Sequence, residues 1–334
     1  MQVVVRKVWV QAHVLWPGIA LCAVVGLAAG FLSEHYGGPQ LLYALLLGLA
    51  LNFLASQDSL APGVMFTSKT LLRVGVALLG ARITIDQIVH LGWKTAILVI
   101  VGVTGTIACG LALSHLLRRP KDEGWISGVA VAICGASAAL AISAALPHTR
   151  ENERNTLFTV MGVTLLSTIA MVLYPLVLGL VDVTGVPAGI FLGATIHDVA
   201  QVVAAGSMLG PEARDSATIV KLFRVALLAP VVVVVSLLAR RGGRSEAHNR
   251  PPIVPVFLMG FVALVVLGSL GLTTPTLTQL ASDGSRALLV AAIAGAAIRT
   301  RLQELALVGW RPMAMLLGET LLLALLVLGG LLLL

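Results

Sequence analysis

Long apolar runs separated by short polar breaks form the main pattern of this chain. Because about 20 apolar residues in a helix cross a bilayer core of about 30 Å, the pattern predicts an all-α polytopic membrane protein. Its breaks carry Gly and Pro turn signals, and none is long enough for a soluble domain, so we expect a single integral membrane domain over 1–334. The pattern predicts about eleven membrane segments, at 14–33, 39–55, 67–83, 94–117, 124–146, 155–181, 186–209, 216–239, 253–272, 284–299 and 313–334.

Composition supports the membrane class. Hydrophobic residues make up 58% and charged residues 11%, whereas a soluble domain carries about 25% charged residues. Cys22, Cys109 and Cys134 lie in apolar runs without ligand spacing, so we expect no disulfide framework, no metal and no cofactor. The net charge of +7 comes from cations in short loops, with no basic patch interleaved with aromatics. This excludes nucleic acid as a partner and leaves the lipid bilayer.

The loop cations predict the orientation. Cationic clusters lie near the N-terminus, at 118–121, at 240–250 and at 299–311, and eleven crossings would place all four on one side, which should be cytoplasmic together with the N-terminus. The loop 148–154 would then lie outside although it carries Arg150 and Arg154. If 124–146 and 186–209 were re-entrant hairpins, that loop would return to the cytoplasm. The sequence leaves both topologies open. The apolar run that begins at Val14 is read as a retained first helix rather than a signal peptide.

Two segments resemble each other. A cation-x-Leu-Leu motif, a later arginine and a Gly-Trp-cation ending align without gaps between 67–94 and 284–311. On either topology the two copies enter the membrane from opposite sides. Inverted repeats are typical of secondary transporters, whose substrate sites form near the membrane midplane. A duplication with consequences for packing alone is the alternative.

The middle of segment 124–146 contains unusually small residues. Cys134, Gly135, Ala136 and Ser137 stand at the expected midpoint of the membrane, where we expect the helix to be interrupted. A helix that restarts there would present backbone N–H groups to an anion. Close packing of helices through small residues is the alternative interpretation.

Segment 186–209 carries polar residues among Gly, Ala and aliphatics, and we expect it to be interrupted near 193–201. His197 and Gln201 share a helix face, and Asp198 is also a neighbour of Gln201. His197 could titrate near neutral pH, and Asp198 could carry a proton or balance a cation. The alternative is a hydrogen-bonded cluster that locks two helices together. Glycines four residues apart from 185 to 193 predict a close helix neighbour.

Lys221 and Arg224 lie three residues apart on one helix face. The functional interpretation is that both face inward and attract an anion, with Arg224 offering a planar fork to two oxygens. The alternative is that both extend to the membrane interface. Secondary candidates are Asn52, Arg73 and Glu319, of which Glu319 lies deepest in its segment.

These motifs together identify a family. Residues 133–138, 196–206 and 220–225, with 71–80 and Arg82 upstream, resemble the YeiH-like family of proposed sulfate exporters from bacterial inner membranes. The resemblance covers nearly the whole chain. It implies the architecture of the cation–proton antiporter and anion transporter superfamily, with inverted repeats and crossing, interrupted helices. Related architectures often form homodimers. This chain departs from the pattern in the alanine-rich run after Ser137.

The sequence therefore predicts a secondary transporter that moves a small inorganic or organic anion, such as sulfate or a related oxyanion or sulfonate, outwards. Residues 134–137, Gln201, Lys221 and Arg224 would bind the substrate, and His197 or Asp198 would couple transport to protons or another ion. An anion channel and a non-transporting membrane scaffold are the alternatives. We do not expect an enzyme, because the apolar surroundings of Cys134 disfavour a reactive thiolate.

Overall fold

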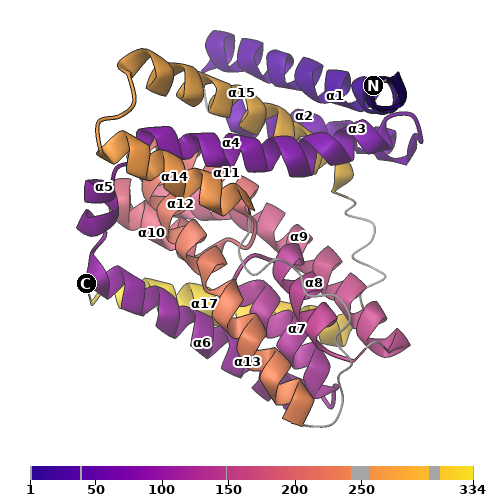
Figure 1. The fold of residues 1–334 in the computed structure, drawn as a ribbon. Helices are drawn as coiled ribbons and strands as arrows, with labels where there is room; N and C mark the ends of the chain where they lie inside the picture. The colour runs from indigo at the N-terminus through magenta and orange to yellow at the C-terminus, as the bar shows by residue number, and fades with distance from the viewer. Residues whose placement is uncertain (1, 38–39, 148, 242–255, 301–308, 334) are drawn as a thin grey trace. The chain divides into compact units, whose positions relative to one another are not determined.

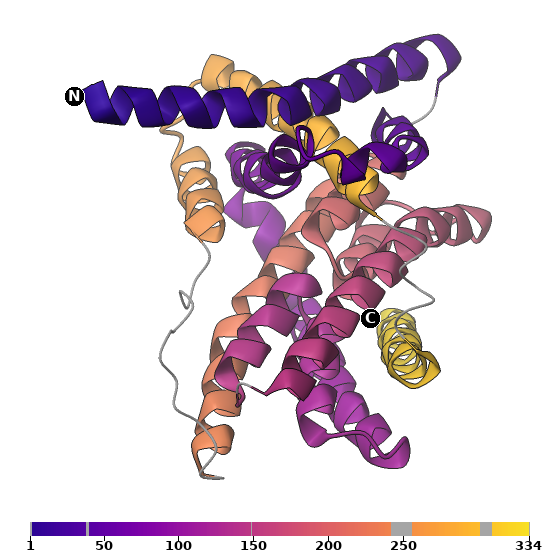
Figure 2. The same cartoon turned by 90° about the vertical axis from the view of Figure 1, so that its right-hand side faces the viewer.

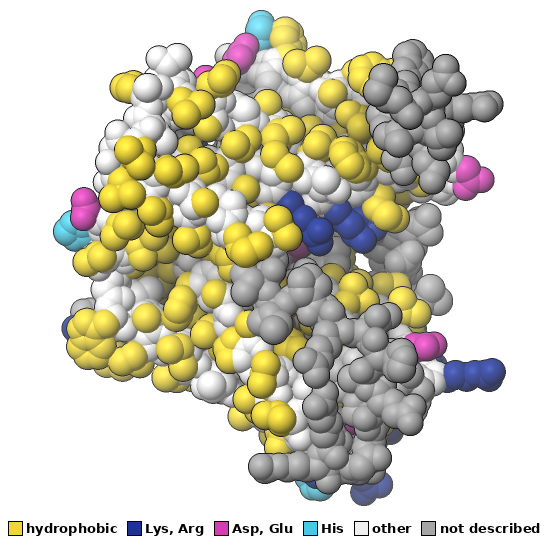
Figure 3. Space-filling view, in the orientation of Figure 1, with side chains coloured by type: hydrophobic (Ala, Val, Ile, Leu, Met, Phe, Trp, Pro, Cys, Tyr) yellow, Lys and Arg dark blue, Asp and Glu magenta, His cyan; other side chains and the backbone are white. Residues whose placement is uncertain are grey.

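The computed structural model describes residues 2–37, 40–147, 149–241, 256–300 and 309–333, apart from the side chains of 2–12, 82, 87 and 239–241. Every regular element within these ranges is a helix (Figure 1). The all-α prediction is confirmed. Hydrophobic side chains cover much of the visible surface of the described residues, as expected for helices that face lipid (Figure 3).

Six helical segments are long and apolar enough to cross a membrane, and five further apolar helices are shorter. The chain is therefore a multi-pass membrane protein, but several predicted segments are not single crossing helices. Segments 39–55 and 67–83, for example, consist of short helical pieces. The six candidate spans are His13–Tyr36, Gly92–Leu116, Arg150–Leu180, Pro211–Leu238, Pro275–Arg299 and Trp310–Leu331.

The chain divides into two compact units. Unit 1 comprises Met1–Asp86 and Val256–Arg301. Its first helix is one long rod, which Figure 2 shows in indigo. The helices of unit 1 are α1 (Gln2–Tyr36), α2 (Gln40–Ala50), η1 (Asn52–Ser56), α3 (Ala61–Phe66), η2 (Thr67–Leu71), α4 (Leu72–Leu79), η3 (Gly80–Arg82), α14 (Val256–Ser269) and α15 (Pro275–Arg299).

Within unit 1, the two segments that resemble each other pack together. The hydroxyl of Ser285 on α15 donates to Gly75 O on α4 at 2.6 Å, and Arg299 Nη1 donates to Ser68 Oγ on η2 at 3.0 Å. The pairing is antiparallel, because Ser285 in the middle of α15 contacts α4 whereas Arg299 at the end of α15 contacts η2, which precedes α4.

Unit 2 comprises Gln87–Pro255 and Leu302–Leu334. The short helix α5 (Ile85–His90) leads into it from unit 1. The further helices of unit 2 are α6 (Gly92–Leu116), α7 (Lys121–Ala132), α8 (Ala136–Ala145), α9 (Arg150–Leu180), α10 (Gly185–Thr195), α11 (Val199–Met208), α12 (Pro211–Ala226), α13 (Leu228–Arg241) and α17 (Trp310–Leu331).

The helices α7 and α8 form a re-entrant hairpin beside α9 (Figure 1). Asn152 near the start of α9 donates from Nδ2 to Asp122 Oδ2 at the start of α7, at 3.1 Å. Thr156, one turn further along α9, donates to Ser143 Oγ near the end of α8 at 2.8 Å. Both arms of the hairpin therefore open at the end of unit 2 where α9 begins. The turn falls at Gly135, whose φ of 61° favours glycine.

The helices α10 and α11 form a second hairpin, which packs on α12. Gly189 and Gly193 of α10 face Ala213 and Val220 of α12 in that order, so these two helices run parallel. Gly206 near the end of α11 faces Ala213 again, which shows that α11 returns to the depth where α10 began. The glycine-lined contact predicted for this segment is confirmed at Gly189 and Gly193, where side chains would separate the helices.

The two hairpins decide the topology of unit 2. The long helix α9 connects them, so they enter from opposite ends of the unit. The residues from Arg150 to Arg154 then lie at the same end as the cationic cluster at 118–121. This is the re-entrant alternative that the loop charges had left open. The second hairpin turns at 196–198, inside the predicted interval 193–201, and the first turns at 133–135, which overlaps the predicted interval 134–137 but begins one residue before it.

The close contact between the second hairpin and α12 can be tested by Gly189→Ala. An added Cβ atom would lie 2.6 Å from Ala213 O, so the helices must separate. We expect the substitution to destabilise the protein by about 1–3 kcal/mol and to lower its melting temperature in detergent.

Gly179→Ala on α9 is the matched control, because nothing lies within 4 Å of the added Cβ. It should leave the melting temperature nearly unchanged. Equal effects of the two substitutions would contradict the packing described for the second hairpin.

Candidate functional site

The turns of the two hairpins meet inside unit 2. Lys221 of α12 donates from Nζ to Ile133 O of the first turn and to Ile196 O of the second, the latter at 3.0 Å. A Cβ atom placed on Gly135 would lie 3.5 Å from the Cβ of His197. The interrupted segments predicted from sequence therefore converge on one location.

The guanidinium of Arg224 joins the same two turns. Its Nε and Nη2 donate to the first hairpin, to Ala132 O at 2.8 and 2.6 Å and to Val131 O at 2.8 Å. Its Nη1 donates to the second, to Gly193 O and Ile196 O at 3.1 Å each. The side chain thus bridges the ends of α7 and α10, each of which carries a partial negative charge and unpaired carbonyls.

Both cations are inside the protein. The exposed fraction is 0% for Lys221 and 1% for Arg224, so the alternative in which they extend to the membrane interface is wrong. The predicted inward orientation is present, but the donors of Arg224 are directed at backbone carbonyls rather than at an open space. In this structure the bonds of both cations go to backbone carbonyls of the two turns.

His197 is fully buried between α7 and α17. Its Nδ1 lies 3.2 Å from Val131 O and its Nε2 lies 3.1 Å from Thr320 Oγ1. Because a carbonyl can only accept, Nδ1 carries a proton. Thr320 has one hydroxyl proton, which it can direct either to Nε2 or to Leu316 O at 2.7 Å. Rotation of this hydroxyl lets the contact accommodate a neutral imidazole or an imidazolium.

Asp198 begins the returning arm of the second hairpin. Its Oδ1 accepts from the backbone N–H of Ala200 at 2.8 Å, which caps α11, and its own N–H donates to Ser167 Oγ at 3.1 Å. The side chain of Asp198 is half-buried. Gln201, on the same helix, donates from Nε2 to Thr168 Oγ1 at 2.9 Å. Among the described residues its buried Oε1 has no partner, so it retains capacity to accept a hydrogen bond.

The start of α8 differs from the start of α11. No side chain in the described structure caps α8, whose N-cap residue is Gly135. Ala136 is half-buried and Ser137 is exposed, while the thiol of the buried Cys134 is hydrogen-bonded to Ser137. The accessible polar groups at the meeting point are therefore the first N–H groups of α8, the Ser137 hydroxyl and the Asp198 carboxylate.

Two contacts from α17 were not predicted from the sequence. Glu319, which is fully buried, accepts from Ser127 Oγ at 2.7 Å through Oε1. Its Oε2 has no hydrogen-bond partner among the residues that the structure describes. The next residue, Thr320, contacts His197. The sequence did offer a signal, because Glu319 and Thr320 form an adjacent polar pair in an otherwise apolar segment. Their partners could not be predicted, because they lie more than a hundred residues away in sequence.

Two secondary candidates lie in unit 1. Asn52 donates from Nδ2 to Thr300 O at 2.6 Å, so it caps the end of α15. Arg73 is exposed. Neither belongs to the unit that contains the hairpin turns, so we leave both outside the site.

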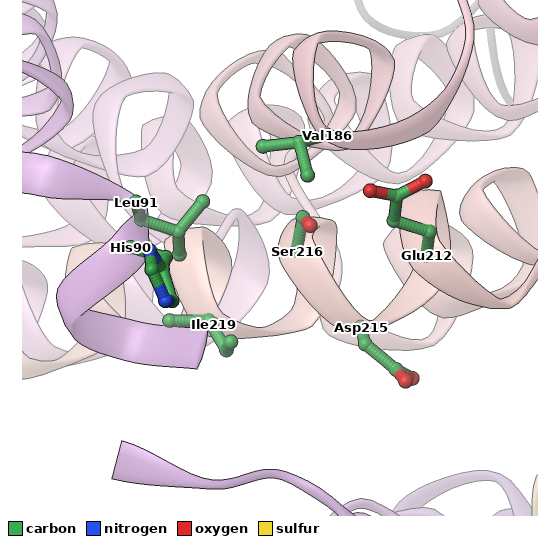
Figure 4. Close-up of a pocket in the computed structure, with 7 residues that line it drawn as sticks. All are labelled: His90, Leu91, Val186, Glu212, Asp215, Ser216 and Ile219. Carbon is green, nitrogen blue, oxygen red and sulfur yellow. The ribbon is translucent and has the colours of Figure 1, made fainter. Parts of the chain in front are cut away.

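A cavity of about 280 Å³ lies at the outer end of the second hairpin (Figure 4). In Figure 4, His90 of α5 lies across from Ser216 of α12, and the carboxylates of Glu212 and Asp215 project from the same helix. The described lining contains both carboxylates and no lysine or arginine. This cavity is therefore unsuited to an anion.

Comparisons with known proteins were made for the whole chain. A family model described as conserved hypothetical protein 698 matches residues 17–316. The chain is 50% identical over 319 residues to the UPF0324 membrane protein TauZ of Paracoccus pantotrophus. The matched region covers 95% of this chain and 94% of the relative. It is 47% identical to UPF0324 membrane protein CT0845 of Chlorobaculum tepidum, over 94% of this chain and 88% of the relative. No solved structure matches.

These matches extend along almost the entire chain and agree with the YeiH-like resemblance seen in its motifs. A third relative, UPF0324 membrane protein RB0971 of Rhizobium meliloti, is 44% identical over 94% of this chain and 92% of its own length. The chain belongs to the UPF0324 family of membrane proteins.

Proposed function

We propose that this protein is a secondary transporter of a small anion that works by alternating access. The observation that carries the proposal is the meeting of two re-entrant hairpins from opposite ends of unit 2 at a pair of buried cations. Interrupted helices inside a membrane are tolerated where they are buried in protein or line a cavity. In secondary transporters such helix ends bind the substrate near the midplane.

The charges at the meeting point favour an anion. Lys221 and Arg224 contribute two positive charges, and an ionised Asp198 contributes one negative charge. The partial charges of the four helix ends nearly cancel. The ends of α7 and α10 each carry about half a negative charge, and the starts of α8 and α11 each carry about half a positive charge. With His197 neutral, the site retains an excess of about one positive charge. An anion would neutralise it.

The proposed binding groups are those at the start of α8. The N–H groups of Ala136 and Ser137 and the Ser137 hydroxyl would donate to the anion, with Gly135 allowing close approach of the backbone. Cys134 would position Ser137, and Gln201 would support the second turn. Several such donors suit a tetrahedral oxyanion or a sulfonate. The resemblance to proposed sulfate exporters makes sulfate the first substrate to test and outward movement the expected direction.

Proton coupling would use groups at the same place. His197 is the primary candidate, because the Thr320 hydroxyl can serve both of its protonation states. Protonation of His197 or Asp198 would add one positive charge and strengthen the attraction of a divalent anion. The charged groups that face His197 are Lys221 and Arg224 on α12 and its neighbour Asp198. Buried Glu319 on α17, with an unpaired oxygen, is a second carrier.

The cationic end of unit 2, with the first turns of α9 from Arg150 to Arg154, would face the cytoplasm of a bacterial inner membrane, as would the N-terminus. Flux measurements in vesicles containing the purified protein test the transport function. Labelled sulfate, sulfite, a sulfonate and a carboxylate would be compared, with empty vesicles as the control. Saturable exchange at carrier rates supports the proposal, channel-like rates support an anion channel, and flux equal to that of empty vesicles supports a scaffold.

The role of the α8 start is tested by Ser137→Ala. Loss of a hydrogen bond to a charged ligand should weaken the apparent affinity about tenfold or more, without a large change in melting temperature. Affinity is measured from the concentration dependence of anion exchange. Ser207→Ala on α11 is the control, because the Ser207 hydroxyl bonds to Val203 O of its own helix. An unchanged affinity in Ser137→Ala would remove this hydroxyl from the site.

The bridging role of Arg224 is tested by Arg224→Lys. The variant keeps the charge but cannot reach the four carbonyls that the guanidinium contacts, so buried acceptors lose their donors. We expect a loss of at least about 2 kcal/mol in stability, measured by thermal unfolding in detergent. Arg214→Lys on the same helix, where the arginine pairs with Asp215, should cost less. Equal losses would argue against a special role for Arg224.

Coupling through His197 is tested by the pH dependence of flux in His197→Gln. We expect the substitution to remove or displace that dependence, because glutamine cannot take up the proton. His115→Gln is the control, since His115 is exposed at the end of α6. Glu319→Gln should leave the dependence intact if His197 alone carries the proton. If flux ignores pH in the unmodified protein, the coupling role of His197 is wrong.

A further inference from the structure

A second cavity lies at the end of unit 2 where α7, α9 and α17 begin. Its volume is about 510 Å³. Four arginines line it, namely Arg119, Arg150, Arg154 and Arg311. The helices are held together below it, since Gly162 of α9 lies against Leu316 of α17. This cavity is separate from the meeting point of the hairpins and has the opposite charge to the cavity in Figure 4.

The positive charge of this cavity is largely uncompensated. Arg119 pairs with Glu123, with Nε and Oε2 2.6 Å apart. Arg150, Arg154 and Arg311 have no carboxylate partner within the described part of the chain. Glu151 is the single acidic residue in the described lining. An excess of about two positive charges therefore remains.

Aromatic rings and a buried amide shape the cavity. The guanidinium of Arg154 lies over the Phe158 ring, 5.1 Å from its centroid, and that of Arg311 lies over the Trp310 ring at 5.4 Å. Such stacking limits the freedom of both arginines. Asn155 is 2% exposed, and its Oδ1 accepts from Arg119. Its Nδ2 has no partner in the described structure, so a buried donor of a residue that lines the cavity is unused.

The surroundings of the cavity indicate where its ligand comes from. Trp310 is 69% exposed at the first turn of α17. Leu317, Leu321 and Leu328 lie on the same helix face, because they follow it by about two, three and five turns, and all are exposed. A tryptophan and arginines above an apolar helix face are typical of the membrane–water interface. A ligand here would have a charged group in the cavity and apolar chains along the helix.

We propose that this cavity binds the phosphate group of an anionic phospholipid from the surrounding leaflet. The arginines and the Asn155 amide would donate to the phosphate oxygens, which accept bidentate bonds from guanidinium groups. The acyl chains would lie on the exposed leucines of α17. A free inorganic oxyanion shares the charged group but would leave this apolar face unused.

The test uses the full-length protein purified in detergent. Phosphatidylglycerol, phosphatidylcholine with the same acyl chains, and inorganic phosphate are each titrated while bound lipid is counted by native mass spectrometry and the melting temperature is recorded. Phosphatidylglycerol should bind more tightly than phosphatidylcholine and should raise the melting temperature. The double variant Arg154→Gln with Arg311→Gln should bind phosphatidylglycerol about thirtyfold more weakly.

The matched control is the double variant Arg118→Gln with Lys121→Gln. It removes two exposed charges from the same end of unit 2 that are outside the described lining, and it should bind the lipid as the unmodified protein does. A melting temperature without lipid close to that of the unmodified protein shows that each variant is folded. Either single variant, Arg154→Gln or Arg311→Gln, should lose about half as much binding free energy for phosphatidylglycerol as the double variant.

Three results would overturn the proposal. The first is equal binding of phosphatidylglycerol and phosphatidylcholine, and the second is equal loss in the two double variants. The third is full protection by inorganic phosphate with no added effect of lipid, which would assign the cavity to a free oxyanion. None of these measurements depends on transport, so the outcome is separate from that of the proposed function.

Discussion

The contact of Lys221 and Arg224 with the backbone carbonyls of two interrupted helices is the interaction on which unit 2 depends. A helix that ends inside a membrane protein leaves carbonyls without partners in the helix, and lipid cannot satisfy them. A buried cation has the complementary problem, because it has lost its hydration. Here the buried cations donate hydrogen bonds to the carbonyls at the helix ends, so both kinds of group gain a partner. Since both cations come from α12 and the carbonyls come from two hairpins, the same bonds fix the position of three separate segments.

The hairpin geometry follows from where small residues stand. Gly135 permits the backbone to turn with a positive φ, and Gly189 and Gly193 let α10 approach α12 closely enough for Arg224 to reach its last turn. The capped start of α11 and the uncapped start of α8 then give the two turns different chemistry. The positions of the polar groups therefore depend on the packing of glycines, which carry no polar side chain themselves.

Much of this arrangement could be predicted from sequence, for identifiable reasons. Polar residues and glycines in apolar runs located both interruptions, because such residues are costly in lipid unless they are used. The choice between crossing and re-entrant segments could not be made, since it depends on contacts such as that between Asp122 and Asn152. The role of Arg224 was also hidden. Spacing shows that a guanidinium faces inward, but its acceptors are backbone atoms that no side-chain pattern reveals.

The cap supplied by Asp198 is present on one of the two turns only, and this would have an energetic consequence if the protein is the alternating-access carrier proposed above. Were both turns chemically alike, the conformations open to either compartment would be related by symmetry and equally populated at rest. In such a carrier, a carboxylate on one turn alone would make the two conformations differ in free energy. The amino-acid sequence itself would then determine which of the two conformations is more populated in the absence of a gradient.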